Sequence, residues 1–116
     1  MFNFEKLEVW QKSIVYAGEV YRVTKTFPKE EQFGLTNQIR RAANSISSNI
    51  AEGSARPPAD FARFLGYATG SLYEVVTQAT IARNECFLTP TAYTQLYADA
   101  EEISRMLSGL RRSLGD

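Results

Sequence analysis

The sequence predicts an all-α protein, an antiparallel up-down-up-down four-helix bundle. Apolar residues recur every three or four positions along four long segments, which is the period of an amphipathic helix. No segment alternates apolar and polar residues as a half-buried strand does. Proline and glycine residues, which break helices, lie between the four segments. The links are short, so consecutive helices are expected to be antiparallel neighbours. These breakers are Pro28, Gly34, Gly53, the pair Pro57 and Pro58, and Pro90.

The first two helices are expected over residues 6–26 and 34–53. The first ends before Pro28, because a residue that precedes proline avoids the helical conformation. The second is expected to end at Gly53, a residue type that favours helix C-termini. The stripe predicted to face the core in the first helix is Leu7, Trp10, Ile14, Ala17 and Tyr21. In the second it is Leu35, Ile39, Ala42, Ala43, Ile46 and Ile50.

The third and fourth helices are expected over residues 58–84 and 90–113. The third begins with Pro58 at its first position, and Asp60 lies in its electropositive first turn. The fourth follows Thr89, a hydroxyl N-cap ahead of a proline. The predicted core stripe of the third is Phe61, Leu65, Ala68, Leu72, Val75 and Ala79. That of the fourth is Tyr93, Leu96, Ala100, Ile103, Leu107, Leu110 and Leu114.

Length and composition limit the possible functions. A chain of 116 residues is one domain, 1–116, with one core. It has no histidine, which excludes imidazole bases and imidazole metal ligands, and its single cysteine, Cys86, suits a reducing cytoplasm. No apolar run reaches the roughly 20 residues that span a bilayer. We therefore expect no catalytic residue, metal site, cofactor, small-molecule substrate or membrane contact.

The first helix carries a second apolar stripe, on nearly the opposite side from the first: Val9, Tyr16, Val20, Val23 and Phe27. A helix of an isolated bundle needs one apolar face, so we interpret this stripe as a subunit interface. The alternative is one broad face around a tight core. In the third helix Gly66 and Gly70 lie on a face of small residues, which permits close approach of another helix; a tolerated exposed pair or a slight kink is the alternative.

A polar seam is expected between the second and third helices. Arg41 should lie within reach of Glu74, because the two helices run antiparallel. We interpret the seam as a hydrogen-bonded network that fixes helix register, and a ligand groove is the alternative. Its residues are Gln38, Arg41, Ser45, Asn49 and Glu52 on the second helix, with Ser71 and Glu74 on the third.

Net charge bears on nucleic-acid binding. Lys and Arg number 13, as do Asp and Glu, so the net charge is zero, whereas proteins that bind phosphate backbones are usually basic. The basic residues that could make such contacts are Arg40, Arg111 and Arg112.

Several stretches resemble the four-helix-bundle family of proteins encoded in intervening sequences of bacterial 23S rRNA genes, and the match extends over essentially the whole chain. The opening is Phe4 to Lys12. The most specific part runs from Phe27-Pro28-Lys29-Glu30-Glu31-Gln32-Phe33-Gly34-Leu35 through Gln38-Ile39-Arg40-Arg41-Ala42-Ala43 and Ser45-Ile46 to Asn49-Ile50-Ala51-Glu52-Gly53. The third helix adds Asp60-Phe61, Phe64-Leu65, Ala68, Gly70-Ser71-Leu72, Glu74 and the stretch from Thr77-Gln78 to Ala82-Arg83. This chain has Pro57 where family members usually carry a Ser or Thr.

The resemblance implies a homopentameric assembly. A related bundle, the accessory variability determinant of diversity-generating retroelements, is also pentameric and binds a reverse transcriptase and nucleic acid, but it is typically more basic than this chain. We therefore expect a non-enzymatic homo-oligomeric scaffold whose main partner is itself. The alternative is an RNA- or DNA-binding accessory protein that acts through a basic rim formed in the oligomer.

Overall fold

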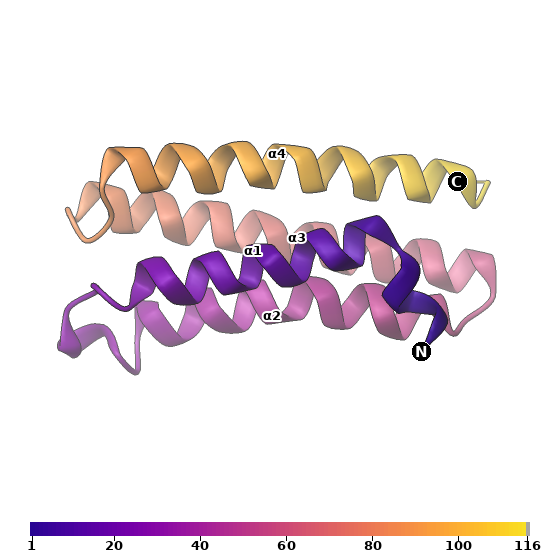
Figure 1. The fold of residues 1–116 in the computed structure, drawn as a ribbon, viewed down its shortest axis with the longest axis horizontal. Helices are drawn as coiled ribbons and strands as arrows, with labels where there is room; N and C mark the ends of the chain where they lie inside the picture. Colours follow the sequence, from indigo (N-terminus) through magenta and orange to yellow (C-terminus); the bar gives the residue numbers. More distant parts are fainter. Residues whose placement is uncertain (116) are drawn as a thin grey trace.

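Four helices make up nearly all of the computed structural model, which describes residues 1–115 (Figure 1). Short 3₁₀ turns precede the first two helices, and no strand occurs in the described part of the chain. The all-α prediction is therefore confirmed. In chain order the elements are η1 (Asn3–Lys6), α1 (Glu8–Thr24), η2 (Lys29–Glu31), α2 (Leu35–Ser54), α3 (Pro58–Asn84) and α4 (Pro90–Ser113).

The helices form an elongated antiparallel bundle of 42 × 22 × 21 Å. Helix α2 packs against α1 and α3, and α4 packs against α3 and α1, so α1 and α3 lie at diagonal corners. Both termini and the α2–α3 turn lie at one end, and the other two links lie at the opposite end (Figure 1). The up-down-up-down arrangement agrees with the short links seen in the sequence.

Local residues mark the starts of α3 and α4. The hydroxyl of Thr89 accepts a hydrogen bond from the backbone N–H of Ala92 at 3.1 Å, so the expected N-cap of α4 is present. Pro58 is the first residue of α3, after an N-cap at Pro57 that offers no side-chain hydrogen bond. Helix α1 is shorter than expected, because Leu7 is extended and separates it from η1.

The core is assembled largely from the predicted stripes of α2, α3 and α4. Ile39, Ile46 and Ile50 of α2 have no exposed surface, and Leu65 and Val75 of α3 are equally buried. From α4 the core receives Leu96, Ala100, Ile103 and Leu107. These three helices therefore face inward as their heptad spacing predicts.

Helix α1 buries a different face from the one expected, which corrects the sequence interpretation. The stripe assigned to a subunit interface lies in the core of the single chain: Val9, Tyr16, Val20, Val23 and Phe27 are all buried. The Tyr16 hydroxyl donates a hydrogen bond to the Leu96 carbonyl of α4 at 3.1 Å, and burial raises the pKa of this phenol. The interface assignment of these five residues is wrong, because the bundle's own interior already covers them.

Two buried hydroxyl groups explain why the inward face of α1 looks less apolar in the sequence than the core face of a helix usually does. Ser13 and Thr24 lie on the same side of α1 and are buried, and each donates to a carbonyl one turn earlier, Val9 and Val20, at 2.7 Å. A hydroxyl bonded to its own helix can enter a core without an unsatisfied group. Of the stripe predicted for the core, Ala17 is buried and Leu7 and Trp10 pack against the core. Ile14 and Tyr21 lie towards solvent, and Ile14 is 45% exposed.

Gly53 allows α2 and α3 to approach closely. The helix ends at Ser54, one residue beyond the predicted end at Gly53. A Cβ built on Gly53 would lie 2.6 Å from the Phe64 Cβ and 3.0 Å from a Phe61 ring carbon. The Phe64 Cβ is attached to the α3 backbone and cannot turn aside, so only glycine fits at this contact.

Gly53→Ala should therefore destabilise the protein by up to about 2 kcal/mol. Overpacking costs roughly 1–3 kcal/mol, and it outweighs the gain of about 1 kcal/mol in helix propensity. Urea unfolding measures the change. Gly109→Ala in α4 is the matched control, because its Cβ meets only the Arg112 guanidinium, at 3.9 Å, and this variant should be as stable as the parent or more so. A stabilised Gly53→Ala variant would contradict the close approach.

Candidate functional site

The solvent side of α1 carries an exposed apolar surface. Val15 is 67% exposed, and Ile14 and Tyr21 are also exposed. Gly18 lies between them on the same side of the helix, and no atom lies near the position that its Cβ would take. We call Ile14, Val15, Gly18 and Tyr21 the outer face of α1. Exposed apolar surface of this kind, on one side of one helix, is typical of an interaction site.

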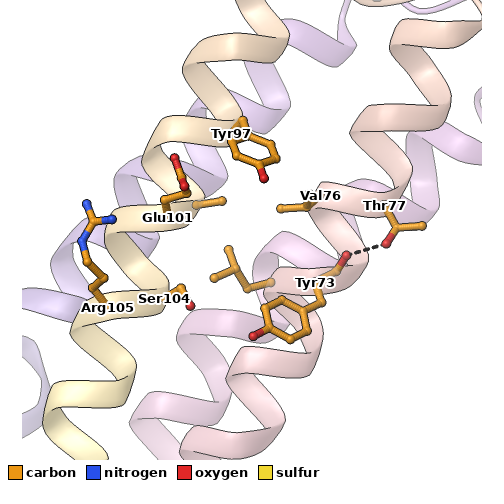
Figure 2. A pocket seen from close by; sticks show the side chains of 9 residues that line it. Tyr73, Val76, Thr77, Tyr97, Glu101, Ser104 and Arg105 are labelled. Carbon is orange, nitrogen blue, oxygen red and sulfur yellow. Dashed lines mark hydrogen bonds between the residues drawn. The ribbon is translucent and has the colours of Figure 1, made fainter.

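A second surface is the groove between α3 and α4, which has a volume of about 560 Å³ (Figure 2). Tyr73 of α3 and Tyr97 of α4 stand on its two sides and are 59% and 45% exposed. Figure 2 shows Val76 between them, while Glu101 and Arg105 lie along α4. The remaining lining residues are Leu72, Thr77, Ala100 and Ser104. Aromatic side chains above an apolar floor, with charges at the margin, suit a docked protein surface.

The two glycines predicted to accept another helix differ in their surroundings. Gly66 is half-buried, and the guanidinium of Arg111 lies 3.3 Å from the position of its missing Cβ. Gly70 is exposed and has no atom near the corresponding position. A side chain of α4 thus covers the first glycine within the chain. Only Gly70, one turn before Tyr73, leaves bare backbone for a neighbouring molecule.

A third surface is a groove of about 430 Å³ between α2 and α3, where the structure brings most of the predicted polar seam together. We call it the polar groove. Glu52 is exposed outside it, and Asn49, one turn beyond Ser45 on α2, does not line it. Its lining residues are Asn37, Gln38, Arg41, Ala42, Ser45, Ser71, Glu74 and Gln78.

One hydrogen bond joins the two walls of the polar groove, and two more within α2 support it. Ser71 Oγ donates to Ser45 Oγ at 2.9 Å, and Asn49 Nδ2 donates to the same oxygen at 3.0 Å and to the Ser45 carbonyl at 2.8 Å. The predicted approach of Arg41 to Glu74 does not close into an ion pair. Within residues 1–115, the ion pairs of 4.0 Å or less do not include either side chain.

The arginines expected to contact nucleic acid have different roles in the structure. Arg40 is half-buried between α1 and α2, where Nε donates to Thr24 Oγ1 at 2.8 Å and the guanidinium stacks on the Tyr21 ring. Arg111 is half-buried beside Gly66, and Arg112 is exposed. Arg40 therefore helps to hold the bundle together, and Arg112 remains the most accessible of the three.

Sequence reasoning missed the lining of the α3–α4 groove. Tyr97 and Arg105 did not belong to any predicted surface, although their spacing from the α4 core stripe places them on its flank. Within the described residues no cluster of Cys, Asp and Glu is suited to hold a metal ion. None of their helices is long and apolar enough to cross a membrane. Cys86 is exposed in the α3–α4 link.

Comparison with known proteins agrees with the fold described above. A solved structure with a TM-score of 0.79 is a protein of unknown function from the S23 ribosomal protein family of Bacteroides thetaiotaomicron VPI-5482. The two share 24% identity over 89% of this chain and 97% of the other, so this likeness shows a common fold. The search of curated proteins gives no match. The family profile of the 23S rRNA-intervening sequence proteins matches residues 5–109, and the chain therefore belongs to the 23S rRNA-intervening sequence protein family.

Proposed function

We propose that the protein is a non-enzymatic scaffold that assembles from copies of itself through the outer face of α1 and the α3–α4 groove. The observation that carries this proposal is the pair of exposed surfaces with complementary character. One is the apolar outer face of α1, which contains Ile14 and Val15, and the other is the α3–α4 groove, flanked by Tyr73 and Tyr97. A cytoplasmic location suits a chain whose single cysteine is exposed and reduced.

The positions of the two surfaces favour a closed ring. Helices α1 and α3 occupy diagonal corners of the bundle, so the outer face of α1 and the α3–α4 groove face different directions. A contact between two different surfaces of identical chains is head-to-tail, and it closes into a ring when the rotation between neighbours is suitable. The number of subunits, five, is taken from the family resemblance. It does not follow from the shape of these surfaces.

Val15→Glu should dissociate the oligomer and leave the bundle folded. The new carboxylate would have to be buried in an apolar contact, while in the free chain Val15 is mostly exposed and its replacement costs little. Size-exclusion chromatography with light scattering measures the mass, and circular dichroism measures the helix content. Thr91→Glu, exposed in the first turn of α4 and outside both surfaces, is the matched control and should keep the parental mass.

The same two measurements can contradict the proposal. If the parent protein runs as a monomer at tens of micromolar, the scaffold proposal fails. If the parent is an oligomer and Val15→Glu keeps the same mass, the chains assemble through another surface.

A nucleic-acid-binding role is the second candidate, favoured by arginines at one end of the bundle. The α2–α3 turn and the C-terminus of α4 lie at the same end of the bundle (Figure 1), and these two segments carry Arg56 and Arg112. Arg56 and Arg63 both stack on the Phe64 ring. A ring would repeat this cluster once per subunit. Chromatography with single-stranded RNA at two salt concentrations tests it, since phosphate contacts weaken as salt rises.

A further inference from the structure

We propose that the polar groove between α2 and α3 binds a small zwitterion, an α-amino acid with a polar side chain. Nothing in the proposed assembly uses this groove, which lies between Gln38 and Arg41 on one helix and Ser71 and Glu74 on the other. The proposal therefore stands independently of whether the chain forms a ring.

The groove holds one positive and one negative side chain that do not meet. Arg41 and Glu74 line its opposite walls, yet neither makes a hydrogen bond or an ion pair with another residue of the described chain. Both side chains are exposed, so a ligand in the groove can reach them from solvent. A ligand placed between them can give its carboxylate to the guanidinium, which binds carboxylates with two parallel hydrogen bonds, and its ammonium to Glu74.

The interior of the groove supplies neutral hydrogen-bonding groups. Ser45 Oγ already accepts from Asn49 and Ser71, so its own hydrogen can be donated to a ligand atom. The side-chain oxygen of Gln78, another lining residue, is buried and has no hydrogen-bond donor within the described chain. Buried amide oxygens are normally satisfied. Because this oxygen has almost no accessible surface, a ligand donor reaches it only when the Gln78 side chain turns towards the groove.

The balance of charges defines the class of ligand. One arginine and one glutamate leave the groove without net charge, which disfavours phosphates and polyanions. Ala42 is the only apolar lining residue, so an apolar ligand would bury little apolar surface. A volume of about 430 Å³ accommodates a molecule the size of an amino acid together with bridging water. The amide of Gln38 can reach a polar side chain on that ligand.

Titration calorimetry with L-glutamine tests the proposal on the full-length protein. We expect saturable binding that weakens about tenfold or more for N-acetylglutamine, which has no ammonium, and for glutamine methyl ester, which has no carboxylate. Arg41→Gln and Glu74→Gln should each weaken L-glutamine binding to a similar extent. Both side chains are exposed, so both variants should melt like the parent by circular dichroism.

Lys25→Gln and Glu30→Gln are the matched controls, because they remove the same charges from exposed positions outside the groove. They should leave the affinity for L-glutamine unchanged. Absence of saturation, equal binding of the two blocked derivatives, or full affinity in Arg41→Gln would each overturn the proposal.

Discussion

Ile46→Asp should unfold the protein. Ile46 lies near the middle of α2 with no exposed surface, in the cluster where the four helices meet. An aspartate there would be ionised without a partner or neutralised at a cost, and it would also lose the packing of the isoleucine. The expected loss is about 4 kcal/mol or more, against a total stability of about 5–15 kcal/mol for a domain of this kind.

Thermal and urea melts followed by circular dichroism measure this effect. Ser48→Asp is the matched control, because Ser48 lies two residues further along α2 and is exposed. It should melt within about 0.5 kcal/mol of the parent. If Ile46→Asp unfolds at the same temperature and urea concentration as the parent, the face of α2 that carries Ile46 is not in the core.

Val20→Glu is expected to destabilise the bundle on nearly the same scale. Val20 has no exposed surface and lies in the hydrophobic core of the single chain. The longer carboxylate must either reach solvent by displacing its neighbours or remain buried without a hydrogen-bond donor. We therefore expect loss of the cooperative melt. If Val20 lay in a subunit interface, as the sequence suggested, the variant would instead form a smaller oligomer of intact bundles.

Ile14→Glu on the same helix separates these two outcomes. Ile14 is 45% exposed, so the free chain should tolerate glutamate there while the mass of the assembly falls. If Val20→Glu instead stays helical and only dissociates, the inward face of α1 is different from the one described here.

Sequence periodicity predicted most of the fold because three helices have a single apolar face. In α2 the stripe of Ile39, Ile46 and Ile50 is flanked by charged and amide residues, so only one orientation buries it. Helix α4 is similar, and its start at Thr89 and Pro90 was predictable because N-cap chemistry is local. The family resemblance was likewise carried by residues adjacent in sequence.

The candidate surfaces were less predictable. The polar seam was found because Arg41, Ser45, Ser71 and Glu74 follow helical spacing on two antiparallel neighbours. The α3–α4 groove was missed because its depth depends on how far apart two helices stand, and no residue pattern reports that distance. The absence of an Arg41–Glu74 pair depends on side-chain geometry in the same way.

The sequence by itself determined the number of helices, their approximate bounds and the core faces of α2, α3 and α4, since these depend on spacing and capping within one segment. Only the tertiary structure decided which side of α1 faces inward. That helix has apolar residues on two sides. The side with Val20 faces the core because its polar groups are satisfied there: Ser13 and Thr24 donate to carbonyls of α1, and Tyr16 donates to a carbonyl of α4. The outcome depends on partners in other helices, which no local pattern contains.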